Sequence, residues 1–161
     1  MTTKSTSWIG ASVERLEDLP LVTGSGRFVA DVSFPHELHM RVVRSAIAHG
    51  RIKGIDTEAA RTLRGVVAVW TAVDIDDVPP IDFREGSNER LAAFRQPVLA
   101  KDYLRYVGEP LAVVFATDPY TAEDAAEVVN SEIEELPAVI DASASAGEFA
   151  PGLSTEPIIC R

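Results

Sequence analysis

The sequence contains very little cysteine and few basic residues. Its 161 residues include one cysteine, Cys160, so no disulfide can form within the chain. Fifteen Lys and Arg residues stand against 25 Asp and Glu residues, which gives a formal net charge of −10. No cluster of basic residues is longer than two, so the basic patch that binds phosphate backbones or anionic lipid is missing. We therefore expect neither nucleic acid nor a membrane surface as a partner.

Long apolar runs are absent as well. The longest run, 110–116, has the length of a strand, far below the roughly 20 residues of a membrane-spanning helix. The start, 1–8, has one cation but no apolar core of a secretory signal, so we expect a cytoplasmic chain. The composition, 46% hydrophobic and 25% charged, is typical of a globular domain.

The spacing of apolar residues predicts an α+β domain between an arm and a tail. Residues 1–26 are polar and rich in turn formers, which predicts an extended arm, and residues 142–161 have no periodicity. The domain is expected to cover 27–141. Its predicted strands cover residues 28–30, 38–43, 51–55, 66–70, 103–107, 111–116 and 130–136.

Two short helices are expected, each between two of these strands. Asp56 can cap the first helix, which Gly65 would end in a left-handed conformation. Asp118 followed by Pro119 is typical of the start of the second helix. Small apolar residues on one side let a helix lie close to a sheet. The predicted packing faces are Ala59, Ala60 and Leu63 on the first helix, and Ala122, Ala125, Ala126 and Val129 on the second.

Two connections are unusual. Residues 75–97 are rich in turn formers, with Asn88 placed to cap one helical turn at 91–94, and a connection this long usually serves an interface or a site. Gly108, before Glu109 and Pro110, separates two predicted strands, which predicts a positive φ or a close backbone approach.

No group of residues makes a convincing catalytic or metal site. Gly24-Ser25-Gly26 is interpreted as a turn, because the strand–loop–helix context of a phosphate-binding loop is missing. His36 and His39 stand three apart, not the four apart of a helical zinc site, which disfavours a metal site. His49 has two interpretations, a hydrogen-bonded turn residue, which is favoured, or a catalytic base.

The remaining reactive or charged side chains also have simple interpretations. Cys160 is interpreted as an inert thiol in the tail. The acidic residues of 123–135 have no basic residue among them, which is typical of a solvated surface. These residues are Glu123, Asp124, Glu127, Glu132, Glu134 and Glu135. We therefore assign no catalytic, cofactor-binding or metal-binding residue.

An ordered set of segments resembles a known family. The most specific segments are 43–52 (VRSAIAHGRI), 105–112 (RYVGEPLA) and 134–139 (EELPAV). Supporting segments lie at 13–18, 22–24, 28–32, 65–69 and 96–100. Over about residues 8–141, the chain resembles the amino-terminal domain of the large subunit of molybdenum hydroxylases. This family includes aldehyde oxidase, xanthine dehydrogenase and aerobic carbon monoxide dehydrogenase.

The resemblance implies an α/β-hammerhead fold, with mixed β-structure and two packed helices. It also implies a part in hydroxylating a carbon centre or oxidising carbon monoxide, with electrons leaving through iron–sulfur and flavin subunits. In the family a longer carboxy-terminal region holds the molybdenum and the pterin cytosine dinucleotide, so no catalytic residue is carried over. The residues that match family signature positions are Arg44, Ser45, His49, Gly108, Glu109 and Pro110.

Two functions are compatible with this resemblance. One is a non-catalytic domain or small subunit of a molybdenum-pterin hydroxylase or dehydrogenase that works with a separate cofactor-bearing chain. The alternative is a stand-alone binding or assembly module, and a homo-oligomer also stays open. In either case a partner surface is expected among apolar residues of the polar segments. These residues are Trp8, Ile9, Phe83, Leu91, Phe94, Ile158 and Ile159.

Overall fold

The protein is described here by a computed structural model, which covers residues 9–10, 12–82 and 95–141. Of the predicted partner-surface residues, only Ile9 lies in this part, and it is exposed. Asn88 with its helical turn, Cys160 and the tail lie outside the described residues. The chain divides into two compact units, residues 1–37 and 38–161. The predicted arm, 1–26, falls within the first unit, and its boundary stays a prediction.

The first unit contains two short helical pieces that sequence analysis missed. Helix α1 covers Asp18–Val22, and a 3₁₀ turn, η1, covers Val29–Asp31; neither has a buried residue. The predicted strand at 28–30 is therefore wrong. The Asp31 carboxylate accepts a hydrogen bond of 2.8 Å from the Phe28 amide, and such local bonds compete with strand pairing. Gly24 has a φ of +71°, as the predicted turn requires.

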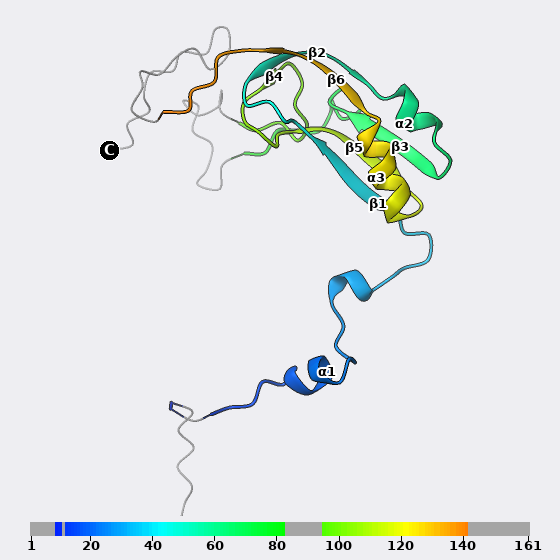
Figure 1. The fold of residues 1–161 in the computed structure, drawn as a ribbon, viewed down its shortest axis with the longest axis vertical. Coiled ribbons are helices and arrows are strands. Elements are labelled where there is room, and N and C mark those ends of the chain that lie inside the picture. The colour runs from blue at the N-terminus through cyan, green and yellow to red at the C-terminus, as the bar shows by residue number, and fades with distance from the viewer. Residues whose placement is uncertain (1–8, 11, 83–94, 142–161) are drawn as a thin grey trace, which may run out of the picture. The chain divides into compact units, whose positions relative to one another are not determined.

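The described part of the second unit, residues 38–82 and 95–141, contains six strands and two helices (Figure 1). Most predicted elements are confirmed within a residue or two at their ends. The exception is the strand predicted at 103–107, which ends after two residues. The elements are β1 (His39–Arg44), β2 (Gly50–Asp56), α2 (Glu58–Thr62), β3 (Val66–Thr71), β4 (Tyr103–Leu104), β5 (Pro110–Ala116), α3 (Pro119–Glu127) and β6 (Asn130–Glu135).

The strands form two antiparallel sheets of three strands each. Their orders are β1-β5-β3 and β4-β2-β6. The predicted strand–helix–strand order is confirmed, and both helices pack against β-strands. Each helix, however, joins strands of different sheets: α2 connects β2 to β3, and α3 connects β5 to β6. Each helix therefore lies in a connection that runs from one sheet to the other.

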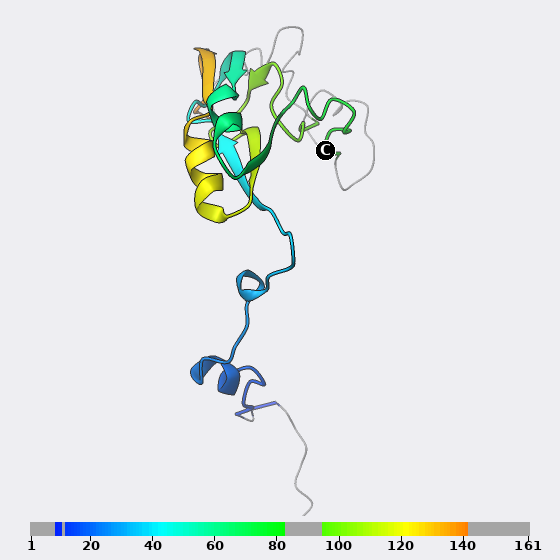
Figure 2. The same ribbon diagram turned by 90° about the vertical axis from the view of Figure 1, so that its right-hand side faces the viewer.

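Both helices cover the same face of the β1-β5-β3 sheet. Helix α3 lies against β1 and β5, and α2 lies against β3 (Figure 2). The core between helices and sheet is built from small and β-branched side chains, which permits the close approach predicted for α3. Its buried members are Ala60, Val69, Ala112, Val114, Ala125 and Val129, with Ala126 partly buried beside them.

The predicted face of α2 is only partly right. Ala60 is fully buried, but Ala59 and Leu63 are exposed. The helix has only five residues, and Leu63 already has an extended backbone with ψ of 134°. Leu63 therefore leaves the helical face on which its spacing places it.

The start of α3 follows the predicted capping chemistry. The Asp118 carboxylate accepts hydrogen bonds from the amides of Tyr120 (3.1 Å) and Thr121 (2.9 Å). Hydrogen bonds from Thr121, first from its hydroxyl and then from its amide, hold the pKa of Asp118 below its ordinary value of 3.8. At α2 the N-cap is Thr57, which makes no side-chain cap hydrogen bond, so the predicted cap at Asp56 is misplaced by one residue. The Asp56 carboxylate still accepts from the Glu58 amide at 3.0 Å. No helix in the described part of the chain is long and apolar enough to cross a membrane.

Candidate functional site

The family-like segments 43–52 and 105–112 meet at two adjoining turns. The Ser45 amide donates to the carbonyl of Glu109 at 3.0 Å, and the Gly108 amide donates to the carbonyl of Ser45 at 2.8 Å. The guanidinium of Arg44 donates to the Gly108 carbonyl at 2.8 Å. Two turns that lie about 60 residues apart in sequence are thus held together, mainly through the backbone.

The hydroxyl of Ser45 makes its hydrogen bonds within its own turn. Ser45 is buried, and its hydroxyl donates to the carbonyl of Ile47 at 2.8 Å while accepting from the Ile47 amide at 2.9 Å. A hydroxyl with both roles filled stabilises a turn and is poorly placed to act as a nucleophile.

The third family-like segment, 134–139, joins the first through His49. The His49 carbonyl accepts from the Leu136 amide at 3.0 Å, and Nδ1 lies 2.9 Å from the Pro137 carbonyl. Because a carbonyl can only accept, the neutral ring carries its proton on Nδ1. Nε2 is buried without a hydrogen-bond partner among the described residues. The favoured interpretation of His49, a hydrogen-bonded turn residue, is confirmed.

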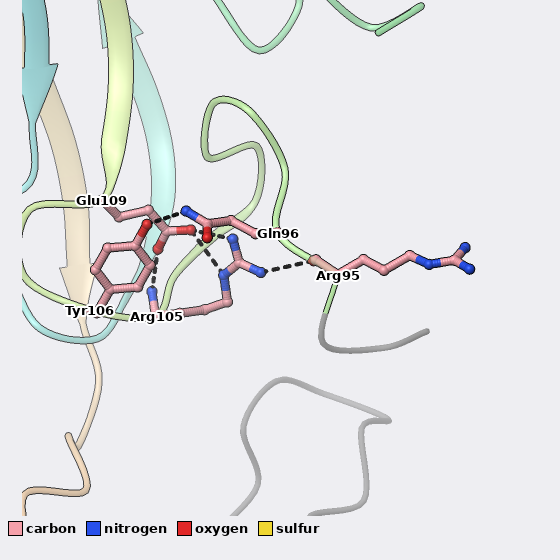
Figure 3. A network of polar contacts seen from close by, with 5 residues as sticks. All are labelled: Arg95, Gln96, Arg105, Tyr106 and Glu109. Atoms are coloured by element: carbon pink, nitrogen blue, oxygen red, sulfur yellow. Dashed lines mark hydrogen bonds and ion pairs between the residues drawn. The ribbon is translucent and has the colours of Figure 1, made fainter. Parts of the chain in front are cut away.

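A buried ion pair closes the turn between β4 and β5 (Figure 3). Glu109 is 1% exposed and the side chain of Arg105 is 13% exposed. The Arg105 guanidinium donates to Glu109 Oε1 through Nε, at 2.9 Å, and through Nη2. The other carboxylate oxygen accepts from the Arg105 amide at 2.6 Å. Glu109 is therefore satisfied from both sides by one residue, which accounts for a charge buried in this position.

The ion pair belongs to a small polar network that reaches the 95–97 segment. Arg105 Nη1 donates to the Arg95 carbonyl at 3.2 Å, and the side-chain Nε2 of Gln96 donates to the Tyr106 hydroxyl (Figure 3). This network explains why β4 ends at Leu104, since the next amide is bound by a carboxylate instead of a strand. Sequence analysis named Glu109 but missed Arg105; an Arg and a Glu four apart, flanking a glycine turn, were the available signal.

Gly108 has the positive φ predicted for it. Its φ is +88°, and a Cβ placed there would meet no atom within 4 Å. Of the two predicted reasons for a glycine, the backbone conformation is therefore the right one, and close approach is not.

This conformation makes a testable prediction. Gly108→Ala is expected to destabilise the domain by about 1 kcal/mol, because an L-residue is strained at this φ although there is room for its methyl group. The matched control is Gly54→Ala in β2, where φ is not positive and space is also open. That control is expected to leave stability unchanged or slightly raised, and urea denaturation measures both. Equal effects of the two substitutions would contradict the strain.

The described residues do not fit a metal ion. No group of three or more His, Cys, Asp or Glu side chains in residues 9–10, 12–82 and 95–141 is placed to hold one. His36 and His39 lie among these residues and belong to no such group. For the whole chain, the absence of a metal site stays a prediction.

The cavities in the same part of the chain also fit a pterin dinucleotide poorly. A cavity of about 460 Å³ has Asp56 and Glu132 among its lining residues, and their negative charges would repel the phosphates of the dinucleotide. A cavity of about 380 Å³ along β1 is lined by Arg41 and Arg44. Both guanidinium groups are already engaged, Arg41 with Glu123 and Arg44 with a backbone carbonyl. Neither cavity therefore fits the pterin dinucleotide.

Comparisons with known proteins relate this chain to one family. A sequence model described as "Aldehyde oxidase and xanthine dehydrogenase, a/b hammerhead domain" matches residues 23–137. The gamma subunit of the 6-hydroxypseudooxynicotine dehydrogenase complex of Paenarthrobacter nicotinovorans is 42% identical over 157 residues, covering 93% of this chain and 20% of that protein. The nicotine 6-hydroxylase large subunit of the same organism is 43% identical over 133 residues, covering 83% and 16%.

A solved structure shows the same relationship. The Cu,Mo-containing CO dehydrogenase matches with a TM-score of 0.72 and 37% identity, over 82% of this chain and 16% of that one. The chain thus spans about a fifth or less of the length of these three relatives. The matched region, 23–137, contains the family-like segments 43–52 and 105–112 and the first four residues of 134–139. The chain belongs to the aldehyde oxidase and xanthine dehydrogenase family of molybdenum hydroxylases, and it carries the α/β-hammerhead domain of that family.

Proposed function

We propose that this chain is a non-catalytic hammerhead module of a molybdenum-pterin hydroxylase or dehydrogenase, working with a separate cofactor-bearing chain. The observation that carries the proposal is the match of residues 23–137 to the hammerhead domain of this family. One relative is named as a subunit of a dehydrogenase complex and another as the large subunit of a hydroxylase. Iron–sulfur and flavin subunits would complete such an oxidoreductase in the cytoplasm.

The chemistry of the signature residues supports a structural role. Polar side chains at the turns where segments 43–52, 105–112 and 134–139 meet make hydrogen bonds to the domain's own backbone or to a neighbouring side chain. These residues are Arg44, Ser45, His49, Arg105 and Glu109. A catalytic group keeps a donor or acceptor directed at a substrate position. These groups instead fix the turns that join the two sheets.

Reconstitution in two pieces tests the proposal. The nicotine 6-hydroxylase large subunit of Paenarthrobacter nicotinovorans is produced without the 133 residues that match this chain, and this full chain is supplied with it. We expect the two to co-elute in size-exclusion chromatography, with molybdenum and pterin found in the complex. The purified chain alone is expected to retain neither after dialysis.

The control is the relative's own 133-residue region supplied in the same way. If that region reassociates and this chain does not, the proposal fails, and the stand-alone binding or assembly module takes its place. Stoichiometric molybdenum on the chain alone would contradict the non-catalytic role.

A further inference from the structure

The two faces of the β1-β5-β3 sheet carry different side chains. In an antiparallel pair, directly opposed residues point to the same side, and neighbours along a strand alternate. Val114 of β5 is buried under the helices, and it opposes Arg41, which forms an ion pair with Glu123 of α3. These residues mark the helix-covered face.

The alternate residues form a second, apolar face. Phe115 opposes Met40 of β1 and Ala68 of β3, while Val113 opposes Val42 and Trp70. The rings of Trp70 and Phe115 touch edge to face, with centroids 4.7 Å apart. We call this set the open sheet face: Met40, Val42, Ala68, Trp70, Val113 and Phe115.

The open sheet face remains accessible to solvent. Met40 is 60% exposed and Trp70 is 45% exposed, and the other four residues are half-buried. None of the six is charged, in a chain with a net charge of −10. Contiguous apolar surface of this kind marks an interaction site, whereas single exposed apolar residues do not.

We infer that the open sheet face docks onto the remaining part of a molybdenum hydroxylase large subunit, an inference that rests on the proposed function. In the relatives 80% or more of the chain lies outside the matched region, so the occupant is a large body in the same enzyme. Stable interfaces of this kind have an apolar, charge-poor centre. Strand β1 lies at the edge of the sheet, and the cavity of about 380 Å³ along it is lined by Met40 and Val42 of the open sheet face together with Arg41 and Arg44.

Charge argues against a second copy of the chain as the occupant. Each copy carries a net charge of −10, so two copies repel one another at low salt. The acidic residues Glu123 and Glu127 lie on α3, the layer that covers the opposite face of the sheet. The open sheet face therefore offers a partner an apolar contact away from these acids.

Lysine substitutions test the docking with the truncated nicotine 6-hydroxylase subunit described above. Met40→Lys and Trp70→Lys each bring a charge into the proposed contact, while the free domain keeps this charge in water. Each is expected to weaken binding, measured by calorimetry, at least about tenfold. Tyr120→Lys on α3, where the side chain is 81% exposed in the helix layer, is the matched control and should bind as the wild type does. Circular dichroism checks the fold of each variant.

Hydroxyl-radical footprinting of the wild-type chain gives a readout that needs no substitution. Complex formation is expected to protect Met40 and Trp70 from oxidation and to leave Tyr120 unprotected. Binding with no protection there, or binding lost only in Tyr120→Lys, overturns the inference and leaves the proposed function intact. A concentration-dependent dimer of the free chain that Met40→Lys abolishes also overturns it, in favour of a second copy. If the wild-type chain does not bind while the relative's own region does, the proposed function itself fails.

Discussion

Replacing Glu109 by alanine is expected to destabilise the domain by about 3–5 kcal/mol. The substitution removes the carboxylate that accepts from the side chain and the amide of Arg105. The guanidinium of Arg105 is then left largely buried, with one remaining bond to the Arg95 carbonyl. The intact ion pair contributes little net stability, because the cost of removing both charges from water offsets their attraction. A single buried charge without its partner keeps the desolvation cost and loses the attraction, so it destabilises the domain strongly. Urea denaturation followed by circular dichroism measures the loss.

Two variants separate this explanation from a general loss of packing. Glu123→Ala removes an ion pair of similar geometry with Arg41, but that pair is about half exposed, so the loss should stay below about 1 kcal/mol. The double variant Arg105→Met/Glu109→Leu removes both charges and should recover a large part of the stability lost in Glu109→Ala. A double variant that is less stable than Glu109→Ala would contradict the unpaired charge as the cause.

Local signals predicted most of the secondary structure. Alternation at 51–55, the apolar run at 66–70 and the Asp118-Pro119 start each depend on neighbours in sequence, and β2, β3 and α3 are confirmed there. The failures arise where a side chain binds the backbone. Asp31 takes the Phe28 amide and Glu109 takes the Arg105 amide, and both interrupt expected strands. Propensity contains no information on such bonds.

The arrangement of the strands and the candidate surface were less accessible to sequence reasoning. Pairing of β1 with β5 and of β2 with β6 joins residues about 75 positions apart, and antiparallel register depends on these distant contacts. In β5 every residue from Leu111 to Ala116 is apolar, so alternation cannot tell the covered face from the open one. The open sheet face was therefore missed, and the partner surface was sought in the polar segments instead.

The second large loss of stability is expected from Ala125→Leu, because α3 lies close to its sheet at this residue. Ala125 is fully buried in the core between α3 and the β1-β5-β3 sheet, against side chains that include Val69 and Val114. The three extra carbons in Ala125→Leu enter a core closed to solvent, so we expect the helix or the strands to shift. We expect a loss of about 1–3 kcal/mol, which thermal or urea unfolding measures. Leucine and alanine have similar helix propensities, so the helix itself contributes little to the difference.

The same substitution at Ala59 isolates the effect of burial. Ala59 lies in α2 next to the buried Ala60, but its own side chain is exposed, so Ala59→Leu should change stability by less than about 0.5 kcal/mol. At Ala126, which is only partly buried beside the same core, leucine should have an intermediate cost because its outer carbons can turn toward solvent. The expected loss of stability is therefore largest for leucine at Ala125, smaller at Ala126 and smallest at Ala59, because the three methyl groups are buried in that order. Equal losses at Ala125 and Ala59 would mean that α3 does not lie close on the sheet, and the small-residue face would then need another explanation.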